Sequence, residues 1–230
     1  MGRDALFDLL ASHNLLVRKR KRRVHTTQSF HWLRKYPNLI RGFEPSGINQ
    51  LWVSDITYWK IVSGYVYISF ITDAFSHKII GYHVAGTLES VETIKALKMA
   101  LSGLIKEPES HFQLVHHSDR GIQYCSHEYV KLLKNNDIMI SMTENGDPLE
   151  NAIAERINGI IKEEYLLAQK VSNLKAAKRA LKQAVKLYNE ERPHNSIANL
   201  VPSFVHNTNL KTEKKWKNYY KEKTIIANQF

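Results

Sequence analysis

The chain has 230 residues, of which 43% are hydrophobic and 24% charged, and this balance predicts a soluble globular protein of one or two domains. Its one cysteine, Cys125, excludes internal disulfides and a cysteine-rich zinc site, which indicates a reducing cytoplasm. No stretch approaches the ~18–20 apolar residues of a membrane span, and no secretory pattern opens the chain, so we expect no membrane partner.

The formal net charge of +11 is unevenly distributed along the chain. Residues 1–50 carry +7, residues 51–155 carry −5 and residues 156–230 carry +9. Basic segments that neutralise phosphates release counterions, so an acidic centre between basic flanks favours a nucleic-acid partner. Charge alone leaves open the alternative of a basic protein without such a partner.

The first 47 residues predict a short helix, a basic arm and a connector. Apolar residues recur at helical spacing over 3–12, and the stretch 24–48 lacks clear periodicity and contains two prolines. Between them lies a run of basic residues, which is either a solvated tail or a nucleic-acid contact. The run comprises Arg18, Lys19, Arg20, Lys21, Arg22 and Arg23.

From residue 50 the chain becomes rich in β-branched and aromatic residues. Three such runs separated by short turns predict three consecutive antiparallel strands, after which helical and extended patterns alternate. We expect strands over 50–61, 65–73, 77–86, 112–117 and 138–142, and helices over 89–106, 127–135, from 148 onward and over 172–190. This order predicts an α/β fold with a mixed five-stranded sheet.

The helix expected from residue 148 has one apolar and one polar face. Asp147, Pro148 and Glu150 read as an N-cap, a first-turn proline and a capping acid. The polar face carries Asn151, Glu155, Asn158 and Lys162.

Three acids on three different predicted elements are the strongest candidates for chemistry. Asp55 lies within the first expected strand, Asp119 follows the fourth, and Glu155 is on the helix. Converging carboxylates suit Mg²⁺, and two such ions roughly 3.5–4 Å apart can promote an in-line phosphoryl displacement. Taken singly, each acid could instead have a structural role: Asp55 as a charge at a strand edge, Asp119 as a turn residue, and Glu155 as a solvated charge on a helix. Glu150 is a rival third acid that its capping role explains.

Other polar residues near these acids have structural alternatives. Asp73, at the end of the second expected strand, could approach the acids, but we expect a turn or pairing role. His116 and His117 precede Asp119, and strand alternation predicts that one faces inward and the other outward.

Five ordered strings resemble a known family. They are WVSDITY, YISFITDAFSHKIIGY, VHHSDRGIQYCS, SMTENGDPLENAIAERINGIIKEE and YNEERPHNSI, and 35 residues separate Asp119 from Glu155. The chain is similar over about residues 2–206 to the second-frame (OrfB) product of two-frame bacterial insertion sequences. These are DDE transposases with the catalytic core of retroviral integrases.

The resemblance implies a ribonuclease H-like fold with helices on both faces of the sheet. It places a basic N-terminal arm and connector at 1–47, the integrase-like core at 48–170 and a helical basic extension at 171–230. It further implies a transposase that cuts DNA and transfers strands at insertion-sequence ends. Asp55, Asp119 and Glu155 would be its catalytic metal ligands, holding two Mg²⁺ ions, for which Mn²⁺ would substitute.

The resemblance also implies DNA contacts and partners. Besides the basic run, the expected DNA-binding residues are Arg120, Asn151, Lys162, Arg192 and His194. Partners would be the terminal repeats, target DNA, further copies of the chain, and an upstream-frame helix-turn-helix protein, since Met1 reads as an internal start. The location would be the bacterial cytoplasm, at the nucleoid when DNA is bound. A non-transposing DNA-binding remnant and a ribonuclease H-type nuclease are the alternatives.

Overall fold

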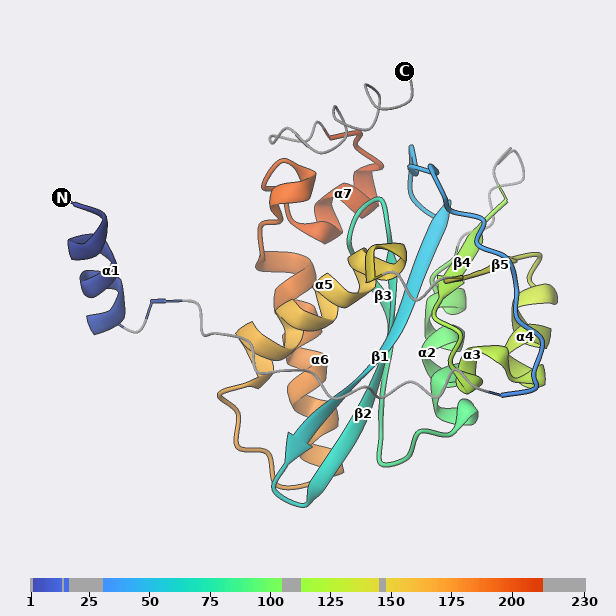
Figure 1. The fold of residues 1–230 in the computed structure, drawn as a ribbon, viewed down its shortest axis with the longest axis horizontal. Helices are drawn as coiled ribbons and strands as arrows, with labels where there is room; N and C mark the ends of the chain where they lie inside the picture. Colours follow the sequence, from blue (N-terminus) through green and yellow to red (C-terminus); the bar gives the residue numbers. More distant parts are fainter. Residues whose placement is uncertain (1, 14, 17–30, 105–112, 145–147, 213–230) are drawn as a thin grey trace, which may run out of the picture.

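The computed structural model describes residues 2–13, 15–16, 31–104, 113–144 and 148–212 (Figure 1). The predicted basic run and the expected N-cap Asp147 therefore lie outside the described residues. Among the described residues, no helix is both long and apolar enough to cross a membrane.

A five-stranded mixed sheet with the order β3-β2-β1-β4-β5 forms the centre of the molecule. The antiparallel pairs β1–β2 and β2–β3 occupy one half, and β4 and β5 run parallel to β1 in the other. The strands are β1 Leu51–Ile61, β2 Gly64–Asp73, β3 Ile79–Ala85, β4 Val115–Ser118 and β5 Met139–Met142. The predicted fold class, three antiparallel strands followed by alternating helices and strands, is confirmed.

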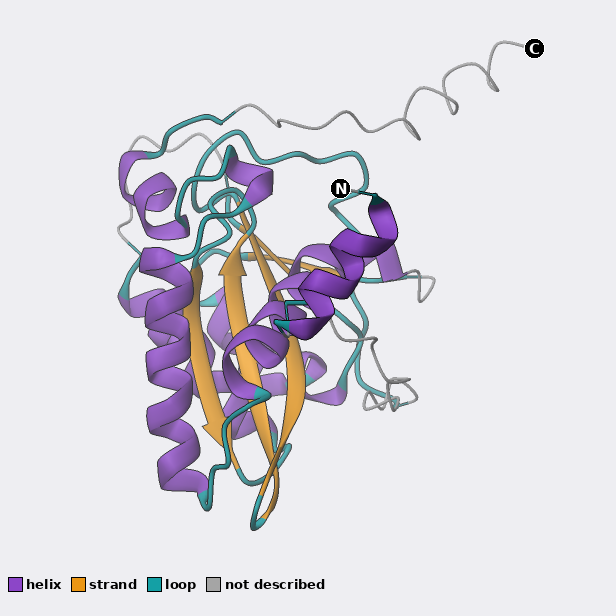
Figure 2. Cartoon of the chain, turned by 90° about the vertical axis from the view of Figure 1, so that its left-hand side faces the viewer, coloured by secondary structure: helices purple, strands orange, loops and turns teal. Residues whose placement is uncertain are grey.

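Helices cover both faces of this sheet (Figure 1). They are α2 Ser90–Ser102, α3 Ile122–Cys125, α4 His127–Lys134, α5 Ala152–Ile160, α6 Leu174–Glu191 and α7 Pro202–Thr208. On one face, Trp59 and Phe70 pack with residues of α5 and α6, and Figure 2 shows α6 running alongside the strands. On the other face, Trp52 and Ile71 pack with α2, α3 and α4.

The N-terminal helix α1, Arg3–Ser12, has no buried residue and lies apart from the sheet in Figure 1. Helix α6 shares a core cluster with β2 and β3. The proposed division of the chain at residues 47 and 170 stays a prediction.

The segment expected to form one long helix from residue 148 is divided into three parts. It begins as a 3₁₀ turn at Pro148–Asn151, continues as α5 and widens into a π-helix at Ile161–Leu166. The carboxylate of Glu150 accepts hydrogen bonds from the backbone N–H of Glu144 (2.7 Å) and from Asn38 Nδ2 (3.1 Å). These bonds join the first turn of the segment to residues outside it. A capping role inferred from the local sequence does not predict such contacts.

The prediction that one of His116 and His117 faces outward is wrong. Both side chains are buried, because β4 is an interior strand and each face of the sheet is covered by helices or loops. His116 Nε2 contacts the hydroxyl of Tyr129, and His117 Nδ1 contacts that of Ser141. Asp73 has the structural role expected of it, because its carboxylate accepts bonds from the Asn49 and Ser76 backbone N–H groups.

Candidate active site

The register of two parallel strands brings two of the predicted acids side by side. β1 pairs with β4 through Leu51 with Val115 and Val53 with His117. Two residues further along are Asp55, still within β1, and Asp119, the residue directly after the end of β4, so both acids lie at the same level. Because side chains alternate along a strand with a period of two, both point to the same face.

Helix α5 crosses this face and carries the third predicted acid. Asn151 Nδ2 donates to the backbone carbonyl of Ser54 (3.1 Å), and Asn158 Nδ2 donates to Asp55 Oδ2 (2.7 Å). Glu155 is four residues after the first amide and three before the second, so it lies on the same side of the helix. The two amides thus orient the face of α5 that carries Glu155 toward Asp55.

Asp55 is in an unusually unfavourable environment for a negative charge. Burial, then the charge of Asp119 and, more weakly, that of Glu155 raise the pKa of its carboxyl to about 7. Hydrogen bonds from the Ile56 backbone N–H and from Asn158 act in the opposite direction. A cation bound between these acids would offset the repulsion and favour the ionised carboxylate.

The chemistry of this group fits a hard cation, although the arrangement is not a closed metal site. All the candidate donors are oxygen atoms, which Mg²⁺ and Mn²⁺ prefer. The Oδ1 atoms of Asn151 and Asn158 are buried without a hydrogen-bond partner among the described residues, so acceptors remain for a hydrated ion. The described residues contain no group of three or more acidic, histidine or cysteine side chains positioned to hold a metal. Coordination by all three acids would therefore require a side-chain rearrangement.

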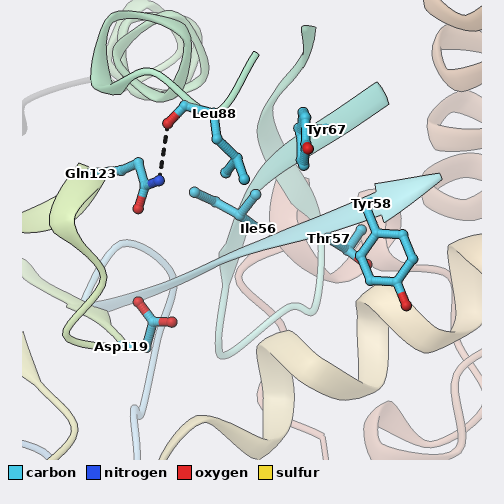
Figure 3. A pocket seen from close by; sticks show the side chains of 7 residues that line it. All are labelled: Ile56, Thr57, Tyr58, Tyr67, Leu88, Asp119 and Gln123. Atoms are coloured by element: carbon cyan, nitrogen blue, oxygen red, sulfur yellow. Dashed lines mark hydrogen bonds between the residues drawn. The ribbon is translucent and has the colours of Figure 1, made fainter. Parts of the chain in front are cut away.

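A hollow opens beside Asp119 where β1 extends past the end of β4 (Figure 3). One side chain of its wall is fixed by a hydrogen bond, in which Gln123 Nε2 donates to the Leu88 carbonyl (2.9 Å). The lining residues are Ile56, Thr57, Tyr58, Tyr67, Leu88, Asp119 and Gln123.

Two of the predicted DNA-binding residues lie on the chain segments that carry Glu155 and Asp119. Lys162 follows α5 in the π-helix, and its Nζ lies 4.5 Å from the centroid of the Tyr58 ring. Arg120 directly follows Asp119, and its Nε is buried without a hydrogen-bond partner among the described residues.

Three other predicted DNA contacts are engaged within the protein. Asn151 is buried against β1, a position that favours support of the site over direct contact with DNA. Arg192 forms two hydrogen bonds with Glu164 (2.6 and 2.8 Å). His194 is buried and stacks on His77 with ring centroids 4.6 Å apart. DNA binding by these residues stays a prediction.

The sequence interpretation placed Asn158 on the polar face of the helix but gave no site role to Asn158, Tyr58 or Gln123. Asn158 had a usable signal, because it is three residues after Glu155 on the same helix face. The rival acid Glu150 is occupied elsewhere, since it also pairs with Arg41 (3.4 Å) and so holds the connector. This favours Glu155 as the third acid.

Comparison with known proteins gives a consistent assignment. Two family profiles, both described as an integrase core domain, match residues 45–148 and 136–202. The 31 kDa protein of insertion element IS600 from Shigella sonnei is 32% identical over 205 residues, which is 88% of this chain and 74% of that protein. The transposase of insertion sequence element IS629, also from Shigella sonnei, is 33% identical over 192 residues, which is 84% of this chain and 63% of that transposase.

Solved structures resemble the fold. The HTLV-2 integrase catalytic core domain in complex with magnesium matches with a TM-score of 0.54 at 24% identity, covering 69% of this chain and 96% of that one. A chain of the simian T-cell lymphotropic virus intasome, in complex with PP2A regulatory subunit B56 gamma, matches with a TM-score of 0.60 at 18% identity, covering 95% and 75%.

The sheet order and its covering helices are those of a retroviral integrase catalytic core, with ribonuclease H-like architecture. The sequence likeness narrows this class. The chain belongs to the integrase-core transposases of IS3-family insertion sequences.

Proposed function

We propose that this chain is a DDE-type transposase that cleaves DNA at insertion-sequence ends and transfers the strands to target DNA. The observation that carries the proposal is the β1–β4 register, which sets Asp55 beside Asp119 beneath the face of α5 that bears Glu155. The chain spans 74% of the IS600 protein and 63% of the IS629 transposase. The activity, substrates and partners of those whole proteins are therefore part of the proposal.

The three acids would hold divalent cations, and the chain's other residues would support them. When bound, Mg²⁺ or Mn²⁺ would activate the attacking oxygen and stabilise the charge on the departing 3′-oxygen. Asn158 fixes the Asp55 carboxylate by donating to one of its oxygens. Lys162 supplies a positive charge on the same side of the molecule for a DNA phosphate. The protein would thus contribute by positioning and by charge compensation, without a covalent protein–DNA intermediate.

The proposed partners are the DNA ends, the target DNA and further copies of this chain, which would bind the DNA together as an oligomer. Both the basic flanks of the sequence and the position of Lys162 support a polyanionic substrate. An upstream-frame helix-turn-helix protein and a location at the bacterial nucleoid are part of the same proposal.

Two other functions would use the same fold. A non-transposing DNA-binding remnant would keep the basic surfaces but not the reaction, and the presence of all three acids speaks against loss of the chemistry. A ribonuclease H-type nuclease would use the same acids on RNA–DNA hybrids, whereas strand transfer requires that a 3′-hydroxyl be joined to new DNA.

One assay separates these possibilities. DNA flanking the gene supplies the terminal repeats, and the full chain with Mg²⁺ is incubated with a labelled end duplex and a plasmid target and, in parallel, with a labelled RNA–DNA hybrid. A transposase gives joined products that contain the label and the plasmid. A nuclease degrades hybrid RNA instead, and a remnant binds the end without any product.

A further inference from the structure

The hollow beside Asp119 lies along a strand edge with which no other described strand pairs. β4 ends at Ser118, whereas β1 continues to Ile61, and the pairs between the two strands run only from Leu51 to Val53. The side of β1 beyond Asp55 that faces away from β2 therefore has no neighbouring strand in the described sheet. A flat group can approach this edge directly next to the acids.

The walls of the hollow suit a planar, partly polar group. Tyr58 and Tyr67 are cross-strand partners, so their side chains lie next to each other on one face of the hairpin. Leu88 and Ile56 add apolar surface, and Figure 3 shows both beside the strand with Tyr58 and Tyr67 further along it. Gln123 donates its amide nitrogen to Leu88, and in Figure 3 its amide oxygen points away from that bond, so it can accept from a ligand.

A positive charge stands at the far end of the same wall. The ammonium of Lys162 is held over the Tyr58 ring, 4.5 Å from its centroid, while the acids stand at the near end. The three features follow one another along β1: a group of acids suited to a hydrated cation, an aromatic and apolar hollow, and a lysine. A nucleotide presents a phosphate, a flat base and a further phosphate in a comparable sequence.

We propose that this hollow takes one unpaired nucleobase of the DNA strand whose phosphate lies at the acids. The base stacks against Tyr58, an exocyclic amino group or ring N–H donates to Gln123 Oε1, and Lys162 binds the next phosphate. Aromatic side chains stack on any base, so the hollow favours an unpaired base over a paired one with little sequence preference. The inference rests on the proposed function, because it assumes that DNA strand ends are the substrate.

The test measures binding without catalysis. Full-length chain is titrated, with Ca²⁺ in place of Mg²⁺ so that the acids stay compensated, into a duplex that ends in an unpaired 3′ nucleotide. That nucleotide carries 2-aminopurine, an ordinary base or no base. Binding should change the fluorescence of 2-aminopurine as the base leaves water, and the abasic end should bind about 10-fold more weakly than the end with a base. Tyr58→Ala should bind both ends equally, and Tyr58→Phe should restore the preference.

Phe204→Ala is the matched control, because Phe204 is an exposed aromatic residue on α7 that does not line the hollow. The Phe204→Ala variant should prefer the base-carrying end over the abasic end as strongly as the wild type does. The inference would be overturned if the wild type bound abasic and base-carrying ends equally, or bound neither. This comparison uses the wild type alone, so it does not depend on whether a variant folds. A preserved preference in folded Tyr58→Ala would overturn it as well. Loss of strand transfer with an intact base preference would count against the proposed function alone.

Discussion

At the residue scale, the environment of Asp55 depends on parts of the chain that are distant in sequence. Its carboxylate accepts from the adjacent Ile56 N–H and from Asn158, which is 103 residues away. The acids could be predicted from the sequence, because each stands in a recognisable string with a regular spacing. The Asn158 bond could not, because an amide on a helix face has no partner until the helix is docked.

We predict that Asn158→Ala weakens catalysis by positioning rather than by removing a reacting group. Without this hydrogen bond the pKa of Asp55 should rise further, so the carboxylate would be harder to ionise and to align with a cation. The concentration of Mg²⁺ required for half-maximal strand transfer should rise by about 10- to 100-fold.

The readout for Asn158→Ala is a Mg²⁺ titration at several pH values. The pH at which activity reaches half its maximum should move upward, a shift that simple loss of folded protein would not cause. Asn207→Ala, at an exposed amide on α7, is the control. An unchanged Mg²⁺ requirement in the Asn158 variant would remove this positioning role.

At the scale of elements, the strands and the helical start at residue 148 were predicted within a few residues, but the division of that helical segment into three parts was not. Alternation of β-branched residues with short turns is a local signal, which is why β1, β2 and β3 could be predicted. The 3₁₀ turn and π-helix on either side of α5 depend on tertiary contacts such as Glu150 with the Glu144 N–H. Helical periodicity carries no information about those contacts.

The packing of α2 on β3 yields a prediction about stability. A Cβ atom on Gly81 would lie 2.3 Å from the Ala96 carbonyl oxygen and 3.0 Å from the Ala100 Cβ, so helix and strand would have to separate. Gly81→Ala should lower the free energy of unfolding by about 1–3 kcal/mol. The melting temperature should fall by about 2–4 °C per kcal/mol.

Gly86→Ala provides a matched control, because a Cβ at Gly86, just after β3, meets nothing within 4 Å. Thermal melts of both variants and of the wild type make the comparison. A Gly81→Ala variant that melts with the wild type would show that α2 is not packed against β3 as described.

At the scale of the whole molecule, buried histidines determine how the fold responds to acid. Burial lowers the pKa of His116 to about 3 and that of His117 to about 4. Burial and the charges of Arg192 and Arg156 lower the pKa of His194 to about 4. Between these values and the ordinary pKa of about 6.5, the unfolded chain binds protons that the folded chain does not, so stability falls as the pH falls.

Asp55 acts in the opposite direction over part of this range. Its raised pKa means that the folded state binds the additional proton, so its contribution is present at low pH and is lost as the pH rises toward about 7. With three histidines against one aspartate, we expect a net loss of stability on acidification.

The acid response can be measured by urea unfolding at about pH 7.5 and about pH 4.5. His194→Phe should unfold with a smaller difference between the two conditions, by on the order of 2 kcal/mol, because one pKa unit corresponds to about 1.4 kcal/mol. The same pH dependence in wild type and variant would mean that His194 is not held neutral by the fold.

The most direct test of the account is strand transfer by variants of the three acids. Wild-type chain, Asp55→Asn, Asp119→Asn and Glu155→Gln are compared with Mg²⁺ on a labelled end duplex, with Glu150→Gln as the control on the same segment. Each of the three variants should lose at least about 100-fold in joined product while binding the end like the wild type, and Glu150→Gln should retain activity. Wild-type amounts of joined product from any of the three would contradict the claim that these acids form one catalytic centre.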